Sequence, residues 1–73
     1  MEIGEKIRRL RIEKQLTQEE LANRCELSKG FISQVENDLT SPSIATLIDI
    51  LEILGTNLTE FFSEASEEKV TYT

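Results

Sequence analysis

The sequence predicts a compact, all-α domain of five helices, and three observations lead to this prediction. Apolar residues recur at the three- and four-residue spacing of helices through most of the chain. Thr17 and Ser28 stand where two helices need N-caps, and only Glu26 and Leu27 are left to form the corner between those helices. The length of 73 residues leaves room for one domain, just large enough to fold alone.

The first helix is predicted over about residues 2–14, because its apolar residues recur at helical spacing. Leu16 is expected to close the following loop onto them. The arginines of this helix are expected to point largely outward, either as a solvated face beside Glu5 and Glu13 or as contacts to a partner. The apolar residues are Ile3, Ile7 and Leu10, and the arginines are Arg8, Arg9 and Arg11.

The second and third helices are predicted from their start signals. Thr17 and Glu20 have the spacing of a capping box, in which each side chain accepts a hydrogen bond from the other residue's amide. Ser28 can cap the third helix in the same way. A corner this tight crosses the two helices steeply and presents the third helix, residues 28–37, as a protruding edge that fits a DNA major groove.

The third helix has an apolar seam and an opposite polar face. Leu27, Ile32 and Val35 form the seam. The polar face carries a cation, a hydroxyl and two amides, groups that hydrogen-bond base edges and phosphates. It also holds a glycine, which costs a helix about 1 kcal/mol relative to Ala and either allows close backbone approach or serves packing. These outward residues are Lys29, Gly30, Ser33, Gln34 and Asn37.

The fourth helix is predicted to begin at Ser41-Pro42 and to end at Gly55. Asn57 and Glu60 form another capping pair, which opens a short fifth helix. The fourth helix is apolar nearly all round, so one neighbour cannot cover it. The excess apolar surface is predicted to form a two-fold dimer contact, which would set the two reading helices about 34 Å apart. The candidates are Ile48, Ile53, Phe61 and Phe62.

The first sixty or so residues resemble the phage-repressor type (Cro-like or XRE-like) helix-turn-helix domain. The resemblance runs through Ile3–Arg11, Leu16–Ala22, Leu27–Ser28, Ile32–Asn37, Ser41–Ser43 and Leu54–Gly55. It implies that helices 2 and 3 form the DNA-binding unit and that Gln18 supports a phosphate and braces the reading helix. It also implies base-facing positions for Lys29, Gly30, Ser33 and Gln34, and a backbone contact for Asn37. Family members usually carry Gly in the corner, where this sequence has Glu26.

Charge is polarised along the chain, whose net charge is −6. Residues 1–40 hold seven bases and eight acids, whereas residues 41–73 hold one base and six acids. Because screening acts within about 8 Å at physiological salt, local cations can still meet DNA. We therefore expect a modest, salt-sensitive affinity, with Arg9 as a phosphate contact and Thr40 helping to fix the register on the DNA backbone.

Several other classes of protein find no support in the sequence. Cys25 is the single cysteine and histidine is absent, so a structural zinc site and an internal disulfide are excluded, and Cys25 is expected to be a small buried residue. No stretch is apolar enough for a membrane span, and the first residues lack the pattern of a secretory signal. No nucleophile set or phosphate-binding loop is present. We expect a cytoplasmic protein that is not an enzyme and has no cofactor.

Residues 1–63 are predicted to form the DNA-binding domain and residues 64–73 a linker or tail. Residues 70–73 alternate like the start of a strand, and one branch of the family carries a cupin-type sensor domain after such a linker. A small-molecule effector is therefore expected only through a C-terminal domain absent from this chain. A complete small repressor with a loose end is the other interpretation.

The sequence thus predicts a transcriptional regulator, with repression expected, that binds a pseudo-palindromic DNA operator as a homodimer. The alternative is a protein-interaction module, antitoxin-like or an adaptor, that keeps the helix-turn-helix shape. Negative charge and the apolar fourth helix favour this alternative. The amides and the lysine of the outward face favour DNA, because a pure protein contact has no use for them at that spacing.

Overall fold

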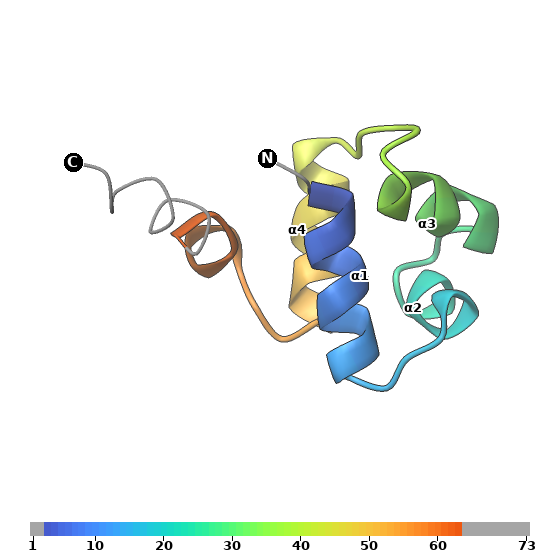
Figure 1. Ribbon diagram of the computed structural model, residues 1–73, viewed down its shortest axis with the longest axis horizontal. Helices are drawn as coiled ribbons and strands as arrows, with labels where there is room; N and C mark the ends of the chain where they lie inside the picture. Colours follow the sequence, from blue (N-terminus) through green and yellow to red (C-terminus); the bar gives the residue numbers. More distant parts are fainter. Residues whose placement is uncertain (1–2, 64–73) are drawn as a thin grey trace.

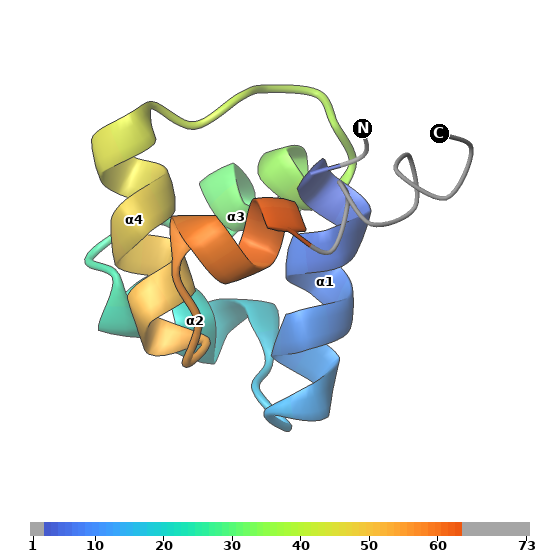
Figure 2. The same cartoon turned by 90° about the vertical axis from the view of Figure 1, so that its left-hand side faces the viewer.

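The computed structural model describes residues 3–63, which form helices and no strand. The helices are α1 (Ile3–Glu13), α2 (Gln18–Arg24), α3 (Lys29–Glu36) and α4 (Ile44–Ile53), followed by a short helix over residues 58–63. Figures 1 and 2 show three layers: α2 and α3 lie on one side, α1 and α4 in the middle, and the helix of residues 58–63 on the far side. The predicted all-α, five-helix fold is confirmed.

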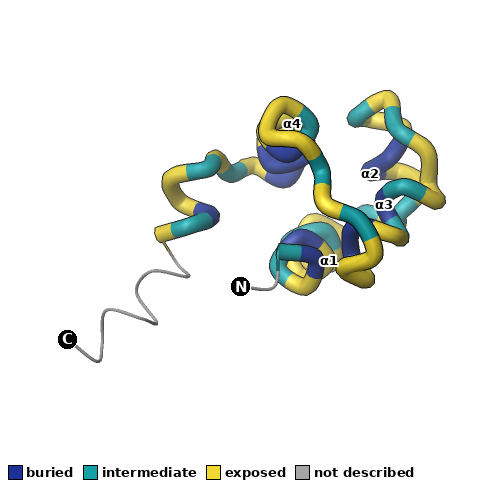
Figure 3. The backbone as a smooth tube through the Cα atoms, turned by 90° about the horizontal axis from the view of Figure 1, so that it is seen from above, coloured by how far each residue is buried: buried dark blue, intermediate teal, exposed yellow. Residues whose placement is uncertain are grey.

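Every helix contributes to one core (Figure 3). Fully burying an aliphatic or aromatic side chain stabilises the folded state by about 1.5–3 kcal/mol, so each short helix depends on its core residues more than on helix propensity. One buried residue from each helix in turn is Ile7, Leu21, Ile32, Ile50 and Phe61, all at most 2% exposed. The predicted seam of α3 is confirmed, since Ile32 and Val35 are buried and Leu27 is partly buried.

The predicted caps of α2 and α3 are confirmed. Thr17 Oγ1 accepts from the Glu20 amide at 3.0 Å, and Glu20 Oε1 accepts from the Thr17 amide at 2.8 Å. The hydrogen bond from the Thr17 amide holds the pKa of the Glu20 carboxyl below its ordinary value, and the Thr17 side chain lowers this pKa further. Ser28 Oγ accepts from the Phe31 amide at 3.0 Å. The corner between α2 and α3 is fixed on one side by the Ser28 cap and on the other by the Leu27 amide, which donates to the Ala22 carbonyl at 2.8 Å.

The start of α4 differs from the prediction. Ser43 is its N-cap, with Oγ accepting from the Thr46 amide at 3.2 Å, and the helix begins at Ile44. Pro42 therefore lies before the cap and is not the first helical residue, because Ser43 provides the capping oxygen that Pro lacks. The predicted cap of the last helix is confirmed, since Asn57 Oδ1 accepts from the Glu60 amide at 2.9 Å.

All four labelled helices end in the same way. A residue with positive φ follows each helix, and the next amide bonds back five residues to a carbonyl of the last turn, as in the Schellman motif. Only the last of these residues is glycine. They are Gln15, Glu26 and Asp38, each with φ of 59°, and Gly55 with φ of 80°. Glu26, at the corner position where family members usually carry Gly, is thus in the left-handed conformation.

The helix of residues 58–63 is fastened to α1 by Lys6. The Lys6 ammonium lies over the Phe61 ring, 4.6 Å from its centroid, and donates a hydrogen bond to the Phe61 carbonyl. Phe61 is 2% exposed and packs edge to face with Phe62, with ring centroids 5.2 Å apart. Phe61 therefore belongs to the core of one chain, which corrects its place among the dimer candidates.

Candidate DNA-binding surface

The outward face of α3 is exposed at both ends and in the middle, except at Ser33. Gly30 and Gln34 are exposed with Lys29, and Asn37 is exposed just after the helix, while Ser33 is half-buried between them. These positions lie on the side opposite the buried seam. In Figure 1, α3 lies at the outer edge of the molecule, away from the helix of residues 58–63. The face that the sequence predicts as the reading surface is thus presented to solvent.

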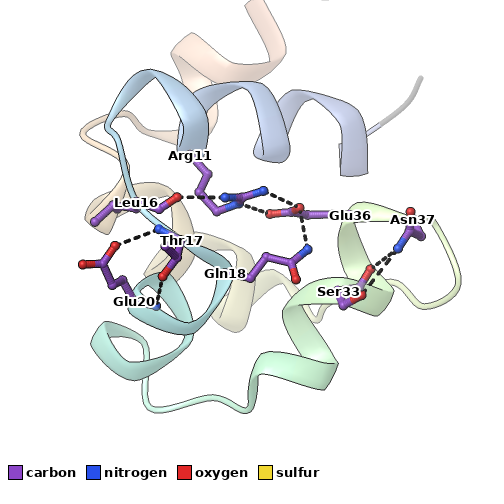
Figure 4. A network of polar contacts seen from close by, with 8 residues as sticks. All are labelled: Arg11, Leu16, Thr17, Gln18, Glu20, Ser33, Glu36 and Asn37. Carbon is purple, nitrogen blue, oxygen red and sulfur yellow. Dashed lines mark hydrogen bonds and ion pairs between the residues drawn. The ribbon is translucent and has the colours of Figure 1, made fainter.

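The one acidic residue of α3 is turned away from this face. Glu36 is 6% exposed and forms a bidentate ion pair with Arg11 of α1, Nε to Oε2 at 2.7 Å and Nη2 to Oε1 at 3.2 Å. Figure 4 shows the pair between the two helices. Burying a paired carboxylate removes the negative charge that would repel phosphates from α3.

The outward orientation predicted for Arg11 is wrong. Its guanidinium also donates to the Leu16 carbonyl at 2.8 Å, so it joins α1, the loop after α1 and α3. Arg8 and Arg9 are exposed, as predicted. Sequence reasoning missed this network because Arg11 and Glu36 are 25 residues apart, and nothing in the spacing of the chain reveals the pair.

Gln18 braces α3, as the resemblance implies. Its Nε2 donates to Glu36 Oε1 at 3.0 Å, so the first residue of α2 holds the last residue of α3. A primary amide has two N–H donors and a carbonyl acceptor. The bond to Glu36 leaves one donor of Gln18 for another partner.

Gln18 and Lys29 line one open groove of about 580 Å³. The groove runs from the end of α1 to the start of α3, and its wall includes the exposed Ile12. The structure therefore brings the starts of α2 and α3 together on one surface. The lining residues are Arg11, Ile12, Gln15, Leu16, Thr17, Gln18, Glu19 and Lys29.

Ser33 and Asn37 form a local pair at the other end of α3. Asn37 Nδ2 donates to the Ser33 carbonyl at 2.9 Å and lies 3.5 Å from Ser33 Oγ (Figure 4). This bond holds the Asn37 amide over the last turn of the helix. Thr40 is half-buried beside a small crevice in the loop that follows. No contact joins Arg9 to this group among the described residues.

Gly30 and Gly4 differ in the space that a side chain would find at each position. A Cβ at Gly30 would meet nothing within 4 Å, so no packing contact requires glycine there. A Cβ at Gly4 would lie 2.3 Å from the Val35 carbonyl oxygen, far inside van der Waals contact. The sequence pattern pointed to Gly30 and not to Gly4, because the neighbours of Gly4 on α3 are remote in sequence.

The exposed surface of α4 holds two isoleucines beside the exposed acids Asp49 and Glu52. Ile44 is 62% exposed and Ile48 is 38% exposed, one turn apart on that surface. Ile53 and Phe62 are partly buried against the core. Three of the four dimer candidates, Ile48, Ile53 and Phe62, thus keep solvent-accessible surface in the single chain.

Cys25 carries no reactive-site geometry. It is the C-cap of α2 and is half-buried. Burial raises the pKa of its thiol, and the Asp49 carboxylate raises it further. A raised pKa keeps the sulfur protonated and unreactive at neutral pH. Residues 3–63 hold no group of acids and cysteine that could bind a metal ion, and none of their helices could cross a membrane.

The chain is similar to known regulators. Residues 7–61 match the family described as Helix-turn-helix. The chain is 32% identical to the immunity repressor protein of Bacillus phage phi105, over 99% of this chain and 52% of that protein. It is 36% identical to control protein C.MunI of Mycoplasma sp, with 89% of each chain covered.

A solved structure extends the similarity to three dimensions. SinR, described as the master regulator for biofilm formation and crystallised in complex with DNA, matches with a TM-score of 0.76. The two are 30% identical, over 82% of this chain and 97% of that one. In contrast, this chain spans about half the length of the phage repressor that it matches.

Proposed function

The chain belongs to the helix-turn-helix family, and from that premise we propose that it is a sequence-specific DNA-binding regulator of transcription, with repression as its action. In this proposal a dimer inserts residues 28–37 of each subunit into successive major grooves of a pseudo-palindromic operator. Regulators and repressors among the relatives, and the DNA complex of SinR, support it.

The observation that carries the proposal is the composition of the exposed face of α3. The face offers a cation, two amides and a hydroxyl, while the acid of the helix is buried against Arg11. Amides bond adenine bidentately and Lys bonds guanine, so such a face can read base edges. We assign base contacts to Lys29 and Gln34, support of them to Ser33, and close backbone approach to Gly30.

Phosphate contacts are assigned to residues around that face. Gln18 keeps one amide donor beyond its bond to Glu36 and shares a groove with Lys29. Ser28, at the start of α3, Asn37 and Thr40, at its end, would fix the register on the backbone, and Arg9 would add a charge contact. With few cations available, binding is expected to be modest and sensitive to salt.

Selection of bound duplexes from a random pool tests the function directly, since a symmetric motif reports operator, dimer and half-site spacing together. On the selected duplex, Gln34→Ala should cost about 1–3 kcal/mol, with little loss on random duplex. Asn23→Ala removes an exposed amide from α2 and serves as the matched control. Equal losses on both duplexes would make Gln34 a phosphate contact.

The alternative function is a protein-interaction module with the same fold. Its support is the net charge of −6 and the exposed isoleucines of α4. Retention on heparin or mixed duplex at low salt separates the two functions. Complete absence of retention would favour the adaptor.

The division of the chain into a DNA-binding domain and a linker or tail is also a proposal. We take residues 1–63 as the DNA-binding domain of a cytoplasmic regulator and 64–73 as a linker or tail. The predicted linker and the strand-like residues 70–73 lie outside the described residues. An effector, if the regulator has one, would act through a further domain of the cupin type.

A further inference from the structure

The first turn of α1 lies directly against the end of α3. A Cβ at Gly4 would lie 2.3 Å from the Val35 carbonyl oxygen, 2.7 Å from that of Glu36 and 2.9 Å from Asp38 Oδ1. Real Cβ atoms do not approach so closely, and two of the three neighbours are backbone atoms that no rotamer change can remove. The absence of a side chain at position 4 is therefore what allows the two helices to meet here.

Asp38 closes the junction from the other side. Its Oδ1 accepts a hydrogen bond from the Gly4 amide at 3.3 Å, and its backbone holds the left-handed turn that ends α3. Amides in the first turn of a helix have no partner within the helix, so the residue that ends α3 also caps α1. The positive end of the α1 dipole thus faces the negative end of the α3 dipole.

A second contact holds the same turn of α3. Arg11, about two turns further along α1, binds the Glu36 side chain. Gly4 contacts the backbone of the last turn of α3, and Arg11 binds the Glu36 side chain in the same turn. Two contacts fix the angle between α1 and α3, whereas a single contact would let α3 rotate about it.

We propose that Gly4 is a positioning residue for the reading helix, and that the Gly4–Asp38 junction sets the tilt of α3 in the major groove. This inference rests on the proposed function. A methyl group at position 4 must push the last turn of α3 away from α1 by about 1 Å to reach ordinary contact distance. The Arg11–Glu36 contact is the fixed point of this movement. Base readout requires placement within about 0.5 Å and 10–20°, whereas flexible phosphate contacts such as that of Arg9 tolerate such a shift.

The test compares Gly4→Ala with wild type on two probes, a duplex selected by the wild-type protein from a random pool and a scrambled duplex of the same composition. We expect the affinity for the selected duplex to fall about tenfold or more, as for loss of a base contact. Affinity for the scrambled duplex should stay within about twofold. Unchanged affinity for the selected duplex, or equal losses on both, would overturn the inference.

Asp38 variants keep the test decisive if Gly4→Ala does not fold. Asp38→Asn retains an oxygen acceptor and tolerates the left-handed turn, so it should bind like wild type. Asp38→Ala should lose selectivity in the direction of Gly4→Ala. Loss of selectivity in both Asp38 variants, or in neither, would contradict the capping role.

A purely structural effect is excluded by two further measurements. Ile50→Val removes a core methyl group on α4 and should lower stability without changing the ratio of the two affinities. Amide chemical shifts at the end of α3 should move in Gly4→Ala and stay in place in Ile50→Val. If wild type selects no duplex at all, the proposed function fails, and these shifts still test the junction by themselves.

Discussion

Single residues with unusual backbone geometry determine where this chain turns. Gln15, Glu26 and Asp38 adopt the left-handed conformation that glycine adopts most easily. An L-residue there is strained by about 1–2 kcal/mol. Asp38 is also bonded to Gly4, whereas Glu26 has no side-chain hydrogen bond or ion pair among the described residues. Glu26 is thus a position where a substitution by glycine can relieve strain without the loss of a side-chain hydrogen bond.

Glu26→Gly should stabilise the domain. The relief of strain exceeds the backbone entropy cost of glycine, and we expect a net gain of about 0.5–1 kcal/mol. Thermal unfolding should show a midpoint higher by about 2–8 °C. Glu19→Gly is the matched control, because Glu19 lies within α2 and the same substitution there should destabilise. An unchanged or lower midpoint in Glu26→Gly would contradict the strained corner.

The variant Gly30→Ala should change the stability of the domain and its affinity for DNA in opposite directions. A Cβ at Gly30 has open space around it, so alanine should stabilise α3 by up to about 1 kcal/mol. On the selected duplex the same methyl group should weaken binding, since it stands between the backbone and the DNA. Unfolding and titration of one variant measure both effects. A stabilised protein with wild-type affinity would show that DNA does not approach this backbone.

At the scale of elements, α2 depends most on its caps. It has seven residues, too few for a stable helix in isolation. Thr17 and Glu20 supply hydrogen bonds at its start, and Gln18 ties it to Glu36 of α3. The geometry of the helix-turn-helix therefore depends on short-range caps at each helix start and on one long-range amide bond.

The capping box makes stability depend on pH. Because hydrogen bonds to Thr17 lower the pKa of Glu20 from its ordinary value of 4.5, the ionised carboxylate stabilises the folded state above that pH. Its contribution is lost as pH falls through the lowered pKa. Glu20→Gln should therefore melt below wild type near neutral pH, and the difference should narrow in acid. Unfolding curves across this range measure it, and a constant difference would contradict the box.

At the scale of the whole molecule, the layers separate the outward face of α3 from the proposed dimer contact. The α2–α3 layer and the helix of residues 58–63 lie on opposite sides of α1 and α4 (Figure 1). The exposed isoleucines lie on α4. A dimer through α4 and Phe62 would therefore leave both reading helices uncovered.

Sedimentation at micromolar concentration should detect that dimer. Ile48→Asp places a charge in the proposed contact and should weaken self-association by about tenfold or more. Ile12→Asp is the control, because Ile12 is 55% exposed on α1 and lies outside the proposed contact. Monomers alone in the wild-type protein would remove the dimer from the proposal.

Local signals in the sequence predicted much of the fold. The capping box at Thr17, the cap at Ser28 and the corner at Glu26 all depend on residues within a few positions of one another. The exposed face of α3 followed from helical spacing in the same way. Pro42 misled the prediction of where α4 starts, since both Ser41 and Ser43 are capping residue types and only the backbone geometry selects Ser43.

The sequence alone was enough to predict the helices, the caps of α2 and α3 and the polar face that α3 presents, because each arises from neighbours in the chain. How α3 is held became clear only from the packing of the whole domain. Arg11 turns inward to Glu36 across 25 residues, Gln18 reaches Glu36 across 18, and Gly4 meets Asp38 across 34. Helical periodicity describes one element at a time, and these contacts exist only once the packing of the core has brought separate elements together.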